Sequence, residues 1–164
     1  MIPAAFEYEL AGSVQEAIEL LGSREDAKLL AGGHSLIPAM KLRIARPGTL
    51  VDIGRLGDLS YVREDGDAIA IGALTRHHDV ATSALVAKRC PILSSSAAEI
   101  GDPQVRHRGT IGGSVSHGDP ASDMPGVLLT LDAEFVVTGP GGQRTVPAAD
   151  FFTGVFETAL GEQD

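Results

Sequence analysis

Residues 110–123 contain Thr110-Ile111-Gly112-Gly113-Ser114, followed by His117-Gly118-Asp119-Pro120-Ala121-Ser122-Asp123, and the rest of the chain is organised around this stretch. Two adjacent glycines let a backbone approach a ligand closely, because neither carries a Cβ atom. The hydroxyl groups of Thr110 and Ser114 add donors that suit phosphate oxygens. A second glycine pair lies upstream in Ala31-Gly32-Gly33-His34-Ser35. Together the two pairs predict two backbone clamps on one ligand with two phosphates.

The composition is that of a soluble globular protein without a general affinity for polyanions. The 164 residues are 43% hydrophobic and 21% charged, enough for one domain with a core or for two small lobes. The net charge of −9 argues against a nucleic-acid partner or an anionic membrane surface. Local donors must therefore hold any dianionic ligand. No stretch has the apolar length of a membrane span, and the N-terminus lacks the pattern of a signal peptide, so the expected location is cytoplasmic.

The first part of the chain is predicted to form a small βαβ lobe. Ser13-Val14-Gln15-Glu16 is a capping box, and apolar residues follow it at helical spacing as far as Leu21. Residues 27–31 are predicted to form a strand that leads into the first glycine pair, a helix begins near Ser35, and residues 49–53 form the next strand. A loop at a helix N-terminus is a natural anion site.

The remainder is predicted to be richer in strands. Thr75 is expected to cap a helix over residues 76–88, and Ser122 to cap a helix with Val127, Leu128 and Leu131 on its core face. The other expected elements are a hairpin over residues 61–71 with its turn at Asp65-Gly66, a helix over 91–100 and a hairpin over 133–146. The fold class is therefore α+β, with one lobe over residues 1–55 and a larger mixed or antiparallel lobe with helices over 56–164.

Other kinds of site find little support in the sequence. His77-His78-Asp79 and His117-Gly118-Asp119 lack a recognised zinc spacing, so no metal site is predicted. The single cysteine, Cys90, cannot form a disulfide framework or a thiolate metal site by itself. No spacing points to a catalytic nucleophile, which argues against a hydrolase. The basic run 106–108 has three possible roles: solvated surface, a positive field beside phosphates, or part of a subunit interface.

Two separated motifs closely resemble the FAD-binding medium subunit of molybdenum hydroxylases, the family of carbon monoxide dehydrogenase, xanthine dehydrogenase and bacterial aldehyde oxidoreductases. The motifs are Leu30-Ala31-Gly32-Gly33-His34-Ser35-Leu36-Ile37-Pro38 and Arg108-Gly109-Thr110-Ile111-Gly112-Gly113-Ser114, the latter followed by Asp119-Pro120-Ala121-Ser122-Asp123-Met124-Pro125. The resemblance extends from the N-terminus to about Leu160. It implies a two-lobed FAD-binding fold of the vanillyl-alcohol oxidase/p-cresol methylhydroxylase type, with FAD between the lobes.

The resemblance also implies the cofactor-binding residues. The first pyrophosphate loop would comprise Ala31, Gly32, Gly33, His34, Ser35 and Leu36, and the second Thr110, Ile111, Gly112, Gly113 and Ser114. Asp123 corresponds to a residue that binds the adenosine side of FAD, and Ile100 to an apolar position near the cofactor. Backbone N–H groups at such loops are expected to bind pyrophosphate without a dedicated lysine. No residue is implied to be catalytic.

In this family the FAD subunit takes electrons from an iron–sulfur small subunit, which holds 2Fe–2S clusters, and passes them to an external acceptor. The substrate is oxidised at a molybdenum cofactor in a large subunit. Such subunits normally continue past the equivalent of Glu157-Thr158-Ala159-Leu160-Gly161 into a C-terminal subdomain that contacts the flavin ring, which this sequence lacks. The sequence is consistent with a natural short form, a misannotated reading frame or a fragment. Two alternative functions are a truncated, non-catalytic assembly module without flavin and a stand-alone flavin oxidase.

Overall fold

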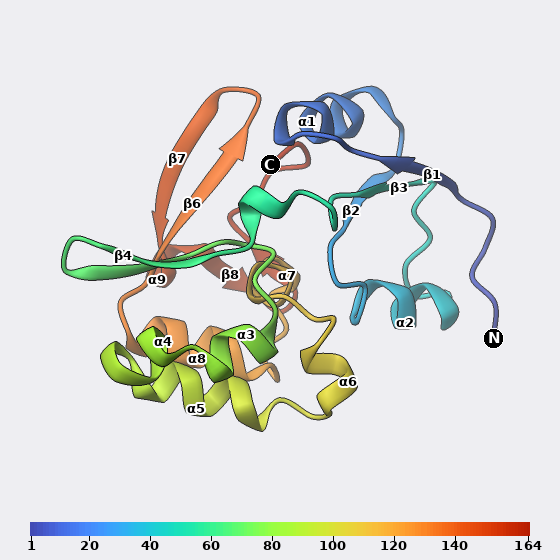
Figure 1. The fold of residues 1–164 in the computed structure, drawn as a ribbon. Coiled ribbons are helices and arrows are strands. Elements are labelled where there is room, and N and C mark those ends of the chain that lie inside the picture. Colours follow the sequence, from blue (N-terminus) through green and yellow to red (C-terminus); the bar gives the residue numbers. More distant parts are fainter.

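Three parallel strands form the sheet of the first lobe. In the computed structural model, which describes all 164 residues, their order is β1-β3-β2, and helices α1 and α2 connect them (Figure 1). The elements are β1 (Glu7–Leu10), α1 (Val14–Ser23), β2 (Ala27–Leu30), α2 (Leu36–Lys41) and β3 (Thr49–Asp52). Parallel neighbours require crossover connections, which the two helices provide. Both loops that follow β2 and β3 therefore lie at the carboxyl edge of the sheet.

The predicted capping box begins α1. The Ser13 hydroxyl accepts a hydrogen bond from the Glu16 amide at 3.1 Å, and the Glu16 carboxylate accepts one from the Gly12 amide at 2.7 Å. The strands predicted over residues 27–31 and 49–53 are also present. Strand β1 was not predicted. Three of its four residues are exposed, so its sequence, Glu-Tyr-Glu-Leu, carries no clear apolar alternation.

The second lobe packs helices and antiparallel hairpins around the larger of two hydrophobic cores. This core contains buried residues such as Val80, Leu93, Met124 and Phe151, whereas the core of the first lobe consists of Ala11, Ala17 and Val51. Its elements are η1 (Gly57–Leu59), β4 (Val62–Asp65), β5 (Ala68–Ile71), α3 (His77–Thr82), α4 (Ala84–Arg89), α5 (Pro91–Glu99), α6 (Pro103–Arg106), α7 (Ile111–His117), α8 (Asp123–Thr130), β6 (Glu134–Gly139), β7 (Gly142–Pro147), α9 (Ala148–Phe151), β8 (Phe152–Gly154) and β9 (Glu157–Thr158). No helix is both long enough and apolar enough to span a membrane.

Several predictions for this lobe are confirmed and others are wrong. Both predicted hairpins form, as β4–β5 and β6–β7, but the turn of the first lies at Gly66-Asp67 instead of Asp65-Gly66, because Asp65 still pairs with Ala68. The helix predicted over 76–88 is interrupted, because Ser83 ends α3 and its hydroxyl caps α4 by accepting from the Val86 amide. Thr75 caps no helix: its buried hydroxyl donates to the Tyr61 carbonyl and accepts from the Tyr61 amide. Leu131 is 37% exposed at the end of α8 rather than in the core.

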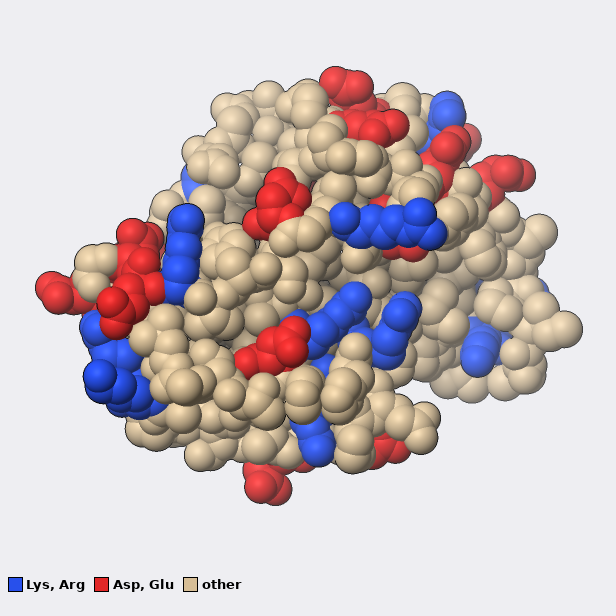
Figure 2. Space-filling model, viewed as in Figure 1, with Lys and Arg blue, Asp and Glu red and all other residues tan.

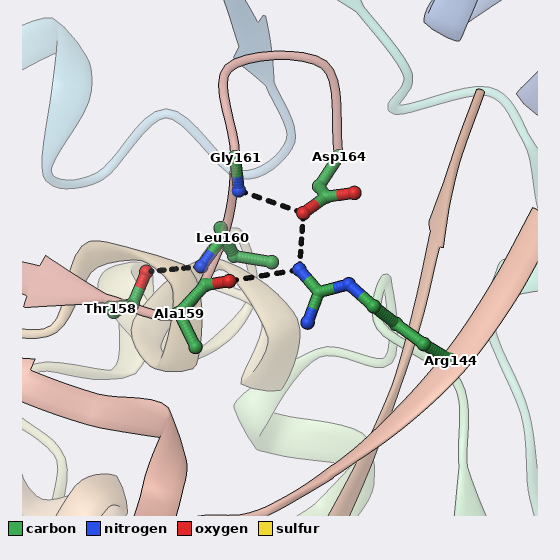
Figure 3. Close-up of polar contacts among 6 residues, drawn as sticks. All are labelled: Arg144, Thr158, Ala159, Leu160, Gly161 and Asp164. Carbon is green, nitrogen blue, oxygen red and sulfur yellow. Dashed lines mark hydrogen bonds and ion pairs between the residues drawn. The ribbon is translucent and has the colours of Figure 1, made fainter. Parts of the chain in front are cut away.

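The C-terminal residues connect the two lobes. The Arg144 guanidinium on β7 donates to the Ala159 carbonyl and pairs with the Asp164 carboxylate, which also accepts a hydrogen bond from the Gly161 amide (Figure 3). A Cβ atom placed on Gly22 of α1 would lie 3.3 Å from the Gln163 side chain. This segment therefore lies between the β6–β7 hairpin and α1, as Figure 1 also shows.

Replacing Asp164 with asparagine is expected to lower the free energy of unfolding by about 1 kcal/mol at neutral pH. The hydrogen bond from the Gly161 amide lowers the pKa of Asp164 in the folded state, and the hydrogen bond and charge of Arg144 add to this shift, while burial opposes it. A lowered pKa stabilises the fold above the unfolded pKa, and this contribution is lost as the pH falls through the folded value. Urea unfolding at a series of acidic pH values should therefore show that the difference in free energy of unfolding between wild type and variant shrinks toward low pH. Asp65→Asn, at the exposed end of β4 and without an ion pair, is the matched control.

Candidate functional site

A cavity of about 240 Å³ opens at the carboxyl edge of the parallel sheet, on the side that faces the second lobe. In α/β folds, ligands commonly bind at this edge of a sheet. The first lobe contributes the loops after β2 and β3, and the second lobe contributes two arginines. The lining residues are Leu30, Ala31, Gly32, Gly33, Ile37, Asp52, Gly54, Arg55, Arg76 and Arg108.

Beside this cavity, the structure brings the first glycine loop into direct contact with the backbone that immediately precedes the second one. A Cβ atom placed on Gly32 would lie 2.2 Å from the Arg108 carbonyl oxygen and 2.9 Å from the Cα atom of Gly109. Such distances exclude any side chain at position 32. Glycine is therefore required here so that the first loop can pack against the backbone that leads into the second loop.

The first loop has a continuous run of unpaired backbone donors. The N–H groups of residues 31–35 donate to no backbone or side-chain acceptor of the protein. Gly33 has a φ of +76°, a conformation that favours glycine. The His34 side chain turns back on the loop, since its Nδ1 atom lies 3.0 Å from the Gly32 carbonyl oxygen. Consecutive unpaired N–H groups form binding sites for anions.

Arginine side chains add positive charge around the cavity. Arg55, Arg76 and Arg108 line it, and none of them takes part in an ion pair of this structure. Figure 2 shows Lys and Arg side chains gathered on the surface between the lobes. Burial and the charge of Arg108 lower the pKa of Arg76, and the carboxylates of Asp79 and Asp52 oppose this effect. An anion in the cavity would offset the repulsion between these cations.

The three residues of the basic run 106–108, for which the sequence left three roles possible, have different surroundings in the structure. Arg106 donates to the Ile100 carbonyl, and the ring of His107 stacks on that of His78 at a centroid distance of 4.0 Å. Of the three, Arg108 alone lines the cavity. Arg55 and Arg76 were not predicted as site residues, because nothing in their local sequence distinguishes them from surface arginines.

Asp52 is the one carboxylate in the cavity wall, and its oxygens are already used. The Tyr8 hydroxyl donates to Oδ2 at 2.6 Å, and the Gly54 amide donates to Oδ1 at 2.7 Å. The hydrogen bond to this carboxylate raises the pKa of Tyr8. Asp52 therefore fixes the loop after β3 and links it to β1.

The second loop forms the first turn of helix α7, and its amides are not available to a ligand. The Ile111 amide donates to the Thr75 carbonyl at 3.0 Å and the Gly112 amide to the Ala73 carbonyl at 2.9 Å. The Gly113 and Ser114 amides donate to the hydroxyl and the carbonyl of Thr110, respectively. This loop can therefore contribute side-chain hydroxyls and a surface without Cβ atoms, but not the N–H groups that its glycines suggested.

A buried histidine packs against the second loop. His77 is 2% exposed, and its Nε2 atom lies 3.0 Å from the Ser114 hydroxyl oxygen. Burial lowers its pKa to about 4, although the negative charge of Asp123 opposes the shift, so the imidazole is neutral at neutral pH. Its other ring nitrogen, Nδ1, is buried and has no hydrogen-bond partner. No pattern in the sequence pointed to a buried, neutral histidine at this place.

The other predicted site residues lie around the two loops. Ser35 is exposed at the start of α2, and Leu36 is half-buried beside it. Ile100 follows α5 and packs against the large core rather than in the cavity wall. Asp123 is exposed in the first turn of α8, where Ser122 precedes the helix without a side-chain cap. No group of three or more His, Cys, Asp or Glu side chains is placed to hold a metal ion.

Known proteins are similar to this chain in sequence and in fold. The family described as the FAD binding domain in molybdopterin dehydrogenase matches residues 4–164. The medium chain of carbon monoxide dehydrogenase from Hydrogenophaga pseudoflava is 51% identical over 165 residues, which cover 100% of this chain and 58% of that protein. The glyceraldehyde dehydrogenase medium chain from Sulfolobus acidocaldarius is 46% identical, with 96% of this chain and 56% of that protein covered.

Solved structures show the same fold. A structure of carbon monoxide dehydrogenase from Hydrogenophaga pseudoflava matches with a TM-score of 0.97 and 52% identity, over 99% of this chain and 57% of that one. The reconstituted enzyme from Oligotropha carboxidovorans matches with a TM-score of 0.96 and 44% identity, over the same shares. The chain thus spans a little more than half the length of its relatives. It belongs to the family of FAD-binding domains of molybdopterin dehydrogenases, which confirms the resemblance seen in its sequence and the fold class and FAD cofactor predicted from it.

Proposed function

We propose that the cavity between the lobes holds the diphosphate of FAD. The observation that carries this proposal is the run of unpaired N–H groups over residues 31–35, in the loop that forms one wall of a cavity lined by three arginines. None of these arginines forms an ion pair, although the Arg76 guanidinium donates to the Arg108 carbonyl. A diphosphate requires several donors and compensating charge, and this wall supplies both in a protein whose net charge is −9.

The two loops have different roles in this proposal. The first loop, with Ala31, Gly32, Gly33, His34 and Ser35, donates its amides to phosphate oxygens. The second loop presents Gly113, which is exposed and lacks a Cβ atom, and the hydroxyl of Ser114. Leu36, Ile100 and Asp123 keep the roles that the family resemblance implies, with Asp123 on the adenosine side.

The relatives support a proposal for the role of the whole protein. We propose that it is the FAD-binding part of a heteromeric molybdenum hydroxylase, in which an iron–sulfur subunit supplies electrons and an external acceptor removes them. FAD would supply the redox chemistry, while this chain binds and orients it. The division into lobes 1–55 and 56–164 and the cytoplasmic location stay predictions, which limited proteolysis and cell fractionation would test.

The visible absorption spectrum of the purified chain tests FAD binding directly. We expect a flavin spectrum that persists after incubation with FAD and desalting, and ADP should displace the flavin because it carries the same diphosphate. A folded protein that retains no flavin and binds no ADP would contradict the proposal. That outcome would favour the alternative, an assembly module that has the flavoprotein fold but binds no flavin.

Replacing Arg76 with glutamine is expected to weaken ADP binding about tenfold, because a charge-assisted contact to the diphosphate is lost. Adenosine, which has no phosphate, should bind wild type and variant equally. Isothermal titration with both ligands measures the difference. Lys88→Gln removes the same charge from the exposed face of α4 and is the matched control. Equal losses for ADP and adenosine would show that Arg76 acts through the fold and not through the phosphates.

A further inference from the structure

The second loop has one accessible hydrogen-bond donor, the Ser114 hydroxyl. The amides of residues 111–114 are all paired within the protein. The hydroxyl of Thr110 is buried and caps α7 by accepting from the Gly113 amide. Ser114 is half-buried, so its hydroxyl is the group of this loop that can reach a ligand. The direction of the O–H bond therefore determines whether this hydroxyl can donate a hydrogen bond to a ligand.

His77 is held rigidly against this hydroxyl. Its backbone N–H donates to the Gly109 carbonyl at 3.1 Å, and residues 76 and 110 form an isolated antiparallel bridge. A Cβ atom placed on Gly109 would lie 2.9 Å from Cδ2 of the imidazole, so the ring packs directly on the glycine backbone. These contacts fix the ring with Nε2 at 3.0 Å from the Ser114 oxygen.

The unpaired Nδ1 atom determines which tautomer is favoured. If Nδ1 carried the proton, a buried N–H group would lack an acceptor, which is rare and costly in folded proteins. If Nε2 carries the proton, that N–H donates to Ser114, and Nδ1 presents a lone pair instead. A serine oxygen that accepts this bond keeps its own hydrogen for another acceptor.

We propose that His77 is a positioning residue whose Nε2–H group donates to the Ser114 hydroxyl oxygen and so directs the Ser114 hydrogen toward a phosphate oxygen of FAD. The inference rests on the proposed function, because it assigns a donor to the second wall of the same diphosphate site. It gives the second loop an active part in binding, although its amides are engaged elsewhere.

A double-mutant cycle on FAD affinity tests this role. His77→Met removes the N–H donor and is expected to raise the dissociation constant of FAD about five- to tenfold, whereas His77→Gln keeps an N–H donor and should stay close to wild type. In a Ser114→Ala background, His77→Met should have no further effect. His78→Met, which changes the neighbouring histidine, is the matched control. Additive effects of His77→Met and Ser114→Ala would overturn the inference.

The tautomer can be observed independently of binding. A long-range proton–nitrogen correlation spectrum of the whole chain should show the His77 proton on Nε2, and a proton on Nδ1 would overturn the inference. Different results would contradict FAD binding by the chain and the role of His77. If the wild-type chain binds no FAD, the proposed function is wrong and the ligand role of His77 falls with it. If wild type and His77→Met bind FAD equally, only the role of His77 is wrong.

Discussion

Replacing Gly32 with alanine is expected to lower the affinity for FAD at least about a hundredfold and the free energy of unfolding by about 2 kcal/mol. The added Cβ atom would lie 2.2 Å from the Arg108 carbonyl oxygen, and a backbone atom cannot rotate away as a side chain would. The two loops must therefore separate. Separation would move the unpaired amides of the first loop away from Arg76 and Arg108, so binding should suffer more than stability.

Fluorescence titration with FAD and chemical unfolding measure the two effects. Gly57→Ala is the matched control, because a Cβ atom at position 57 meets nothing within 4 Å. The control should bind FAD as wild type does. Normal FAD affinity in a folded Gly32→Ala variant would mean that the close contact of the loops does not shape the binding site.

Local sequence predicted those parts of the fold in which one residue determines the geometry by itself. The Ser13 hydroxyl accepts from the Glu16 amide, and the Glu16 carboxylate from the Gly12 amide, wherever the helix packs. Gly66, with a φ of +59°, suits a tight turn in any hairpin, although the turn is one residue later than predicted. The helix over 76–88 was predicted as one element because no glycine or proline interrupts this segment. The break at Ser83 depends on the competition between its side chain and the helix backbone, which a composition pattern does not resolve.

The second glycine pair shows how tertiary contacts override local preference. Adjacent glycines disfavour a helix, so Gly112 and Gly113 suggested a loop with free amides. In the structure they lie in the first turn of α7, because the backbone of residues 73–75 accepts the amides of Ile111 and Gly112. These acceptors are more than 30 residues away, counting from Thr75 to Ile111, and no local pattern reveals them.

The positive charge of the site could not be predicted for the same reason. Arg55 follows β3, Arg76 precedes α3, and Arg108 precedes α7. Each is an ordinary arginine in its own segment. Their meeting at one cavity depends on the contact between Gly32 and Arg108, which joins the lobes. The glycines were therefore recognisable from sequence as points of close approach, while the partners that they approach required the fold.

Replacing Gly113 with valine is expected to abolish retention of FAD while leaving the fold largely intact. Gly113 is exposed, so the valine methyl groups would occupy the surface beside Ser114 that a phosphate must approach. Its Cβ atom would also lie 2.8 Å from the Thr110 hydroxyl oxygen, which caps α7. Losing that cap costs about 1 kcal/mol, and the better helix propensity of valine offsets part of it. We therefore expect the variant to lose its flavin absorbance after desalting, while its unfolding midpoint stays close to that of wild type.

Gly126→Val is the control for this prediction, because Gly126 also lies in a helix, α8, and a Cβ atom there meets nothing within 4 Å. We expect that variant to retain flavin as wild type does. Gly113→Ala should lie between wild type and Gly113→Val, since a single methyl group blocks less of the approach. Wild-type flavin content in folded Gly113→Val would mean that the ligand does not pass close to the second loop. The site would then consist of the first loop and the arginines alone, and Ser114 and His77 would have no part in it.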